Sequence, residues 1–232
     1  MKLGIMQPYI FPYIGYYQLI GAVDKFIVYD NVQYTKKGWI NRNRLLQNGK
    51  DMTFSIPLRN DSDFLSIRDR WISADFNRER LLNRITEDYR RAPHFEQMFP
   101  LIRDILKFGD KNLFGFIYNS ILRTCEYLNI ATEILISSTV PIDHSLKNLD
   151  RVLAFCKSAG AEIYVNSIGG MELYSKETFR EEGIDLQFIR PKPFEYEQFG
   201  NEFVPWLSII DVMMFNDRDM ISAAISGNYD LV

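Results

Sequence analysis

The sequence predicts an α/β protein with a Rossmann-like, mostly parallel sheet, helices on both faces of that sheet and a helical middle segment. Two observations predict this class. Strand-like and helix-like runs alternate nearly to the end of the chain, and the links between them are short. At 76–129 the alternation gives way to apolar residues at helical spacing. The length of 232 residues suits one α/β domain spanning 1–232.

The first third of the chain predicts four strands and one helix. Apolar runs at 1–6 and 25–29 indicate strands, and the apolar stretch at 14–23 indicates the helix between them. Two further extended runs are expected to pair as a hairpin, because Asn48-Gly49 between them favours a two-residue turn. These runs span 39–46 and 51–58.

The middle and final thirds continue the two patterns. Three helices are predicted in the middle, at 77–91, 95–108 and 111–128. Asp110 is expected to be the N-cap of the third helix. Gly160 and Gly183 each lie between the end of a predicted helix and the start of the next predicted strand, where C-cap glycines occur. The later strands are expected at 133–137, 162–166 and 185–189, and the later helices at 146–158 and 176–182. The apolar run at 203–211 has helical spacing and is expected to bury the end of the chain.

Composition excludes several classes of protein. A net charge of −3 leaves no electrostatic footprint for DNA or RNA, so no nucleic-acid partner is expected. No basic segment followed by an apolar run begins the chain, and no apolar stretch reaches the ~18 residues of a membrane span. Cys125 and Cys156 lie in apolar, helix-like contexts and are interpreted as buried free thiols. Free thiols indicate a reducing compartment, so the expected location is the cytoplasm.

Metal and prosthetic-group sites are not predicted. His94 and His144 are the only histidines, and neither has a cysteine nearby or a second histidine at ligand spacing. No zinc site is therefore expected, and nothing in the sequence predicts haem or flavin. The 14% share of aromatic residues mildly favours a ligand pocket. The sequence neither predicts nor excludes a homo-oligomer.

The opening motif resembles the signature of a known family. Residues 7–16 read QPYIFPYIGY and are followed by YDNVQ at 29–33 and GWINRN at 38–43. These motifs resemble the WbqC-like family, whose bacterial members are often encoded in O-antigen and other surface-polysaccharide gene clusters. Further resemblance lies at 89–93, 167–170 and 203–211. The resemblance implies a transferase of lipopolysaccharide or related biosynthesis that acts on a sugar nucleotide or another activated substrate.

A weaker resemblance links the same motif to the His-x-Gly-His nucleotidylyltransferase superfamily, which includes pantothenate synthetase. Tyr13 and Tyr16 replace the two histidines around Gly15. In addition, Ser138 and Thr139 belong to a Ser-Ser-Thr run like the one that binds phosphate in those enzymes. A phenol with a pKa of ~10 can donate a hydrogen bond to phosphate but cannot become cationic near neutral pH. The substitution predicts retained nucleotide binding with altered chemistry.

The first candidate site residues follow the first two strands. Gln7 and Tyr9 lie just past the first strand, at the edge of the sheet where ligands bind; the alternative role is a turn. Gly15 would let a ligand approach the backbone at a helix start that favours anions. Asp30 and Gln33 follow the second strand. Asp30 is a candidate to act as a general base, to bind Mg²⁺, or to hold an amine or a ribose; the alternative is a capping residue in a turn.

The basic segment at 36–44 is the best candidate for a phosphate clamp. Arg42 and Lys37 would hold phosphate charge, Trp39 would offer a stacking face and Asn41 would bind substrate. The alternative is a solvated basic loop.

The later candidates follow the strands at 133–137 and 162–166. His144 lies between a strand and a helix and either faces the crevice or caps the helix. Gly169 and Gly170 would expose backbone amides for a phosphate or carboxylate; the alternative is a tight turn.

Three functions are compatible with these residues. The first is ATP-dependent N-acylation of a nucleotide-linked amino sugar with a small amino acid such as glycine. It uses ATP with Mg²⁺: Tyr13 and Tyr16 bind the nucleotide, and Asp30 orients or deprotonates the amine. The second is a nucleotidylyltransferase acting on a sugar phosphate. The third is a non-catalytic protein that binds sugar nucleotides.

Overall fold

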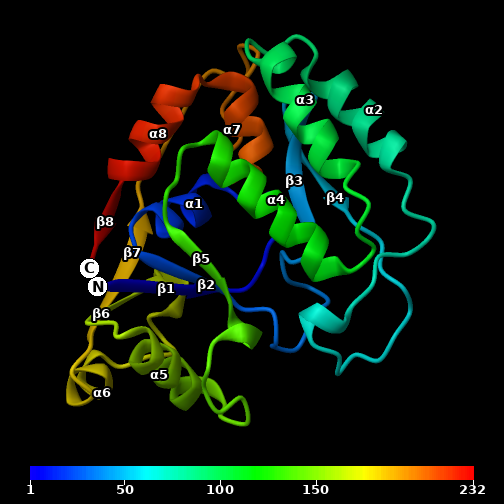
Figure 1. Ribbon diagram of the computed structural model, residues 1–232. Helices are drawn as coiled ribbons and strands as arrows, with labels where there is room; N and C mark the ends of the chain where they lie inside the picture. Colours follow the sequence, from blue (N-terminus) through cyan, green and yellow to red (C-terminus); the bar gives the residue numbers. More distant parts are fainter.

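A six-stranded sheet organises the computed structural model, which describes residues 1–232 (Figure 1). The strand order is β5-β2-β1-β6-β7-β8. Five strands are parallel, and only β8 runs antiparallel to its neighbour β7. The strands are β1 (Lys2–Met6), β2 (Lys25–Val28), β5 (Glu133–Ile136), β6 (Ile163–Ser167), β7 (Asp185–Pro191) and β8 (Tyr229–Leu231). The predicted mostly parallel sheet is confirmed.

Helices cover both faces of the sheet, as predicted. Strand residues alternate between two hydrophobic clusters: Leu3 and Ile5 belong to the smaller one, whereas Phe26 and Val28 belong to the larger. The smaller cluster packs under α5 (Asn148–Ala159) and α6 (Lys176–Glu181). The larger packs under α1 (Ile14–Gly21), α7 (Ile209–Phe215) and α8 (Arg218–Gly227). None of the helices combines the length and apolar character that a membrane crossing requires.

The chain reverses its direction of travel across the sheet between β1 and β6. It moves outward from β1 to β2 and β5, then crosses to β6 on the other side of β1 and continues outward to β7. In open α/β sheets, ligands bind at the carboxyl ends of the strands beside such a reversal. The segments that follow β1 and β6 are therefore the first place to look for a site.

The middle segment is helical, as predicted, and contains α2 (Arg78–Tyr89), α3 (Phe95–Leu106) and α4 (Leu113–Tyr127). The prediction that Asp110 caps α4 is wrong. Asn112 is the N-cap, and its side chain accepts a hydrogen bond from the Gly115 N–H at 3.0 Å. Asp110 instead accepts one from the Asn112 N–H, at 2.8 Å, and so supports the cap from outside the helix.

The predicted hairpin is present as a separate two-stranded sheet of β3 (Arg42–Gln47) and β4 (Lys50–Ser55). Asn48 and Gly49 have φ angles of 51° and 72°. Positive φ at both turn residues is the requirement that Asn-Gly meets. The first strand starts later than predicted, so Trp39 and Asn41 lie in the segment that enters the hairpin.

The C-terminal apolar run departs from the expected helix. α7 begins only at Ile209, with Ser208 as its N-cap. The segment before it forms neither a helix nor a strand, and Trp206 has a φ of 61° and is 61% exposed. A large aromatic residue with positive φ is a rare backbone state. Helical spacing was misleading here because Trp206 does not contribute to the core.

Candidate functional site

An aromatic groove lies where β1, β7 and the hairpin come together. Its small hollow, of about 250 Å³, is lined by Tyr9, Pro12, Tyr13, Trp39, Asn43, Arg44 and Trp206. Its large hollow, of about 550 Å³, lies between the start of α1 and the chain that follows β7. Tyr13 and Trp206 line both hollows. Their rings meet edge to face with centroids 5.8 Å apart. This pair of rings thus lies at the boundary of two adjacent hollows, which together are called the groove.

The phenols of the groove are available to a ligand. Neither the Tyr9 nor the Tyr13 hydroxyl has a hydrogen-bond partner within the chain. Burial raises the pKa of both phenols, and the neighbouring Tyr13 raises that of Tyr9 further. Both groups therefore stay protonated near neutral pH and act as hydrogen-bond donors to oxygen atoms of a ligand.

Two arginine guanidinium groups lie over the indole ring of Trp39. Trp39 is 41% exposed, and the Arg42 and Arg44 guanidinium carbons lie 5.3 and 5.4 Å from its ring centroid. Arg44 also donates to the Trp206 carbonyl oxygen at 3.0 Å and pairs with Asp51 at 3.2 Å. Arg44 thus joins the hairpin side of the groove to the C-terminal side and places positive charge beside a stacking surface.

Sequence reasoning did not identify four residues of the small hollow, namely Pro12, Asn43, Arg44 and Trp206. Asn43 is buried and donates to the carbonyl oxygens of Ile10 and Phe11 at 3.0 and 2.8 Å. Arg44 stood in the basic segment but was passed over in favour of Arg42. Trp206 was assigned to a core helix. Pro205 inside the apolar run was a signal against that helix, because a proline lacks the backbone N–H and disfavours helical backbone at the residue before it.

Tyr16 does not reach the groove. It is 3% exposed, its ring packs against Phe26, and its hydroxyl donates to the Gln7 carbonyl oxygen at 3.0 Å. Burial raises the pKa of this phenol well above its usual value. Of the two tyrosines in the motif, the structure therefore places only Tyr13 where a ligand can contact it. Tyr16 has the aromatic packing role of a core residue.

Gly15 makes room for Tyr13. A Cβ added at Gly15 would lie 2.4 Å from atoms of the Tyr13 ring and its hydroxyl oxygen, a separation that real Cβ atoms essentially never show. The missing side chain thus lets the ring lie over the helix start. This differs from the expectation that Gly15 admits a ligand to the backbone.

Replacing Gly15 by alanine is expected to displace the Tyr13 ring, and the cost of this displacement should offset the gain of about 0.5–1 kcal/mol that alanine has over glycine inside a helix. In a Tyr13→Ala background the same Gly15→Ala change is expected to raise the free energy of unfolding by that full amount, since its clash partner is gone. A double-mutant cycle by chemical denaturation measures this coupling. Equal effects of Gly15→Ala in both backgrounds would show that the ring does not depend on the glycine.

The basic segment does not form an open clamp. Asn41 accepts from the Tyr34 hydroxyl and donates to the Ile56 carbonyl oxygen, both at 2.7 Å, so its amide holds the hairpin in place. Arg42 donates to the carbonyl oxygens of Gly38 and Lys37. Lys37 is exposed and lines neither hollow. Of the four clamp candidates, only Trp39 lines the groove.

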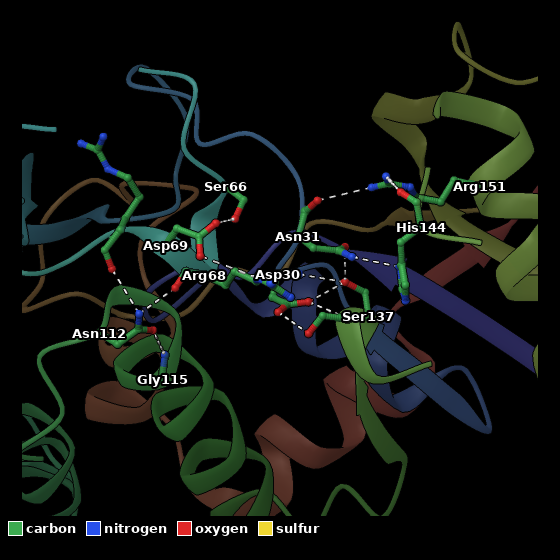
Figure 2. Close-up of polar contacts among 12 residues, drawn as sticks. Asp30, Asn31, Ser66, Arg68, Asp69, Asn112, Gly115, Ser137, His144 and Arg151 are labelled. Carbon is green, nitrogen blue, oxygen red and sulfur yellow. Dashed lines mark hydrogen bonds and ion pairs between the residues drawn. The ribbon is translucent and has the colours of Figure 1, made fainter. Parts of the chain in front are cut away.

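A second group, the polar cluster, connects the carboxyl ends of β2 and β5 (Figure 2). Asp30 is 2% exposed. One carboxylate oxygen accepts from the Ser137 hydroxyl at 2.7 Å and the Ser138 N–H at 2.9 Å, and the other accepts from the Ser138 hydroxyl at 2.7 Å. The buried carboxylate is compensated by these donors, so in this conformation it ties two strands together.

His144 belongs to the same cluster. Its Nδ1 lies 3.1 Å from the Asn31 side-chain nitrogen, and Arg151 donates to the Asn31 carbonyl oxygen at 3.3 Å (Figure 2). Thr139 is exposed, and its hydroxyl donates to the Ile136 carbonyl oxygen at 2.9 Å. The structure therefore brings Asp30, Ser138 and His144 into one region, but in positions that line neither hollow of the groove.

The remaining candidates are dispersed along the same edge of the sheet. Gln33 is exposed and donates to the Asp63 carbonyl oxygen at 2.9 Å. Gly170 makes room for Asn166, whose amide nitrogen would lie 2.3 Å from a Cβ there. Gly169 is exposed with open space around it, as an anion-binding amide would require. Gln7, Gly169 and Gly170 follow β1 and β6, and none of them lines the groove.

A buried carboxylate, that of Asp211, forms a hydrogen bond with Tyr196 in the wall of the large hollow. Asp211 is fully buried and accepts hydrogen bonds from the hydroxyls of Tyr89 and Tyr196 at 2.8 and 2.7 Å. Gln198 donates to it at 2.8 Å. Burial raises the pKa of this carboxyl, and the three hydrogen bonds oppose the rise. Tyr89 also accepts from the Leu46 N–H, so one carboxylate links the hairpin, α2 and the loop after β7.

Comparison with known proteins gives one family and one named relative. A model of the WbqC-like protein family matches residues 7–223. The Uncharacterized protein Rv1507c of Mycobacterium tuberculosis is 27% identical over 220 residues, which cover 93% of each of the two chains. No solved structure matches the chain.

Proposed function

The chain belongs to the WbqC-like protein family, and from this premise we propose that it is a transferase acting on a nucleotide-linked amino sugar in surface-polysaccharide biosynthesis. The single observation that carries the proposal is the aromatic groove at the carboxyl edge of the sheet. Its small hollow combines exposed indoles, free phenols and Arg44. Stacking faces with a few polar donors suit a ring-bearing, oxygen-rich ligand.

Each part of that ligand has a suitable partner in the groove. A base or sugar ring would stack between Trp39 and Trp206, and stacking of a base on an aromatic side chain stabilises by about 1–3 kcal/mol. The phenols of Tyr9 and Tyr13 would donate hydrogen bonds to hydroxyl or phosphate oxygens. Arg44 would place a guanidinium group beside the phosphate while it keeps its pair with Asp51. The groove thus supports binding of a sugar nucleotide better than binding of a fully apolar molecule.

The proposed reaction is ATP-dependent N-acylation with glycine or another small amino acid. The carboxylate would attack the α-phosphorus of ATP to form an acyl adenylate and release pyrophosphate. The amine of the sugar would then attack the acyl carbon, so that an amide forms and AMP leaves. Mg²⁺ enters this scheme only with the ATP phosphates, because the Asp30 oxygens already accept three hydrogen bonds. Asp30 would act as a base only after Ser137 or Ser138 releases it.

The test is incubation with ATP, glycine and a panel of nucleotide-linked amino sugars, with amide product and AMP measured together. We expect Tyr13→Phe to weaken binding of the sugar nucleotide by about tenfold, because a hydrogen bond to a charged phosphate contributes about 1.5–3 kcal/mol. Tyr16→Phe is the matched control and should keep wild-type affinity, since its hydroxyl faces the Gln7 carbonyl oxygen. No amide product with any sugar, together with equal affinities of the two variants, would contradict the proposal.

A second candidate is a non-catalytic protein that binds sugar nucleotides. The burial of Asp30 favours it, because this carboxylate is only 2% exposed and already accepts three hydrogen bonds from Ser137 and Ser138. This candidate requires tight binding in the groove with neither AMP nor amide formed. Release of pyrophosphate from a nucleoside triphosphate and a sugar phosphate would instead indicate a nucleotidylyltransferase. The burial of Tyr16 weakens that alternative, since only one of the two motif positions reaches the groove.

A further inference from the structure

The large hollow of the groove is an aromatic enclosure with a chemistry of its own. It contains five aromatic side chains, of Tyr13, Phe194, Tyr196, Phe203 and Trp206. The Tyr196 ring meets those of Phe194 and Phe203 at centroid distances of 5.6 and 5.2 Å. The face of an aromatic ring carries partial negative charge and attracts cations. Several such rings around one cavity form the type of site that binds ammonium groups.

The charged side chains at this hollow add negative potential. Glu195 and Glu202 line it and form no ion pair in the chain. The single lysine in its lining, Lys192, pairs with Asp230 at 2.6 Å. Behind the wall, the Asp211 carboxylate accepts the Tyr196 hydroxyl at 2.7 Å. The hollow therefore presents carboxylates whose charge is not balanced locally, which disfavours an anionic ligand.

Trp206 is held in place before any ligand arrives. Its carbonyl oxygen accepts from Arg44 at 3.0 Å, and the next residues are tied down by Ser208 N–H to the Arg44 carbonyl oxygen and Ile209 N–H to that of Pro12, both at 2.9 Å. These bonds maintain the positive φ of Trp206, a strained state that clusters at functional sites. The fold thus keeps a large, half-solvated indole at the boundary of the two hollows.

We propose that the large hollow binds an organic ammonium group, with the aromatic rings around the cation and Glu195 and Glu202 at its rim. The identification of this cation as the amino group of the acceptor sugar rests on the proposed function; ammonium binding itself does not. The small hollow would then hold the nucleotide part, and the Tyr13–Trp206 pair would lie against the link between the two parts.

Titration with glucosamine and with glucose tests the charge preference directly, at slightly acidic pH where the amine is protonated. The readout is the Trp206 indole N–H resonance, assigned from the Trp206→Phe spectrum. We expect glucosamine to bind at least about fivefold more tightly than glucose, and the preference to shrink with added salt because the rim carboxylates are exposed. Choline and its uncharged carbon analogue neohexanol provide a second pair of probes that differ in charge.

A double variant and a control variant test whether Glu195 and Glu202 cause the preference for glucosamine. Glu195→Gln combined with Glu202→Gln should reduce the preference for glucosamine to about twofold or less, with unchanged thermal unfolding. Glu197→Gln is the matched control, because Glu197 is exposed on the same loop but lines neither hollow. Equal affinity for both members of each probe pair, or a preference that survives in the double variant, would overturn the inference.

The outcome also separates this inference from the proposed function. Sugar-nucleotide binding that depends on Tyr13, without any ammonium preference, would refute the ammonium site and leave the proposed function standing. An ammonium preference abolished in the double variant, without sugar-nucleotide binding or turnover, would establish the cation site and refute the proposed function.

Discussion

Replacement of Asp211 by alanine is expected to lower the free energy of unfolding by about 3 kcal/mol or more, because a buried donor left without an acceptor costs about 1–3 kcal/mol. Three donors lose their acceptor in this variant, namely the hydroxyls of Tyr89 and Tyr196 and the amide of Gln198. Relief of the desolvated charge offsets part of this loss. Chemical denaturation of the variant and the wild type measures the difference.

Asp219→Ala provides the control for this prediction. Asp219 is exposed in the first turn of α8 and forms no ion pair, so its loss should change stability by no more than about 0.5 kcal/mol. If Asp211→Ala unfolds no more easily than Asp219→Ala, the three hydrogen bonds do not hold the loop after β7 against the hairpin. Other contacts would then have to hold the wall of the large hollow in place.

The Asp211 carboxyl is expected to make the free energy of unfolding fall as pH rises. Burial raises the folded-state pKa of Asp211 above the unfolded value of 3.8. Between these two values the folded state binds more protons than the unfolded state, so stability falls as pH rises through that window. Asp211→Asn removes this contribution. We therefore expect the stability of the wild type relative to Asp211→Asn to decrease as pH rises above about 4 and then level off. A difference that increases with pH would contradict the raised pKa.

Replacement of Trp206 by glycine and by alanine is expected to separate binding from stability. Both changes remove the indole shared by the two hollows, and both should weaken sugar-nucleotide binding by about tenfold or more, as loss of one stacking face does. Their stabilities should differ. Alanine keeps a side chain at a φ of 61°, whereas glycine adopts that angle freely, so Trp206→Gly should be more stable than Trp206→Ala by about 1 kcal/mol.

Trp71→Ala is the control for the loss of an exposed indole. Trp71 is 43% exposed and lines neither hollow, so its removal should leave ligand affinity unchanged. Calorimetric titration and denaturation of all three variants complete the comparison. Wild-type affinity in both Trp206 variants would remove this residue from the site. A Trp206→Gly variant less stable than Trp206→Ala would show that the positive φ stores no strain.

The class of fold was predictable because its signals are local. Each signal involves only a few neighbouring residues. The alternation of apolar strands and helices predicted the sheet, the helical spacing at 76–129 predicted the middle helices, and Asn48-Gly49 predicted the hairpin, and all three are present. The cap of α4 was misplaced by two residues because Asp110 and Asn112 are both good N-caps, and only backbone geometry chooses between them.

The candidate site was predictable only where it lies close to the opening motif. Tyr9, Tyr13 and Trp39 were identified from residue type and position, and all three line the small hollow. Asp30, Ser138 and His144 also lie at the carboxyl edge, but they form a cluster separate from the groove. Residue type shows that a side chain can bind a ligand. It does not show whether other parts of the chain already occupy its donors and acceptors, as they do at Asn41.

By itself the sequence determined the parallel sheet, its carboxyl edge and the aromatic motif beside it, because strand periodicity and turn chemistry are properties of neighbouring residues. Only the tertiary structure decided which aromatic side chains face a ligand. Tyr16 turns into the core while Tyr13 lies over Gly15, a choice made by packing against Phe26 and by the space that the glycine leaves. Trp206 reaches the groove because hydrogen bonds to Arg44 and Pro12, distant in sequence, hold a backbone angle that no local preference favours.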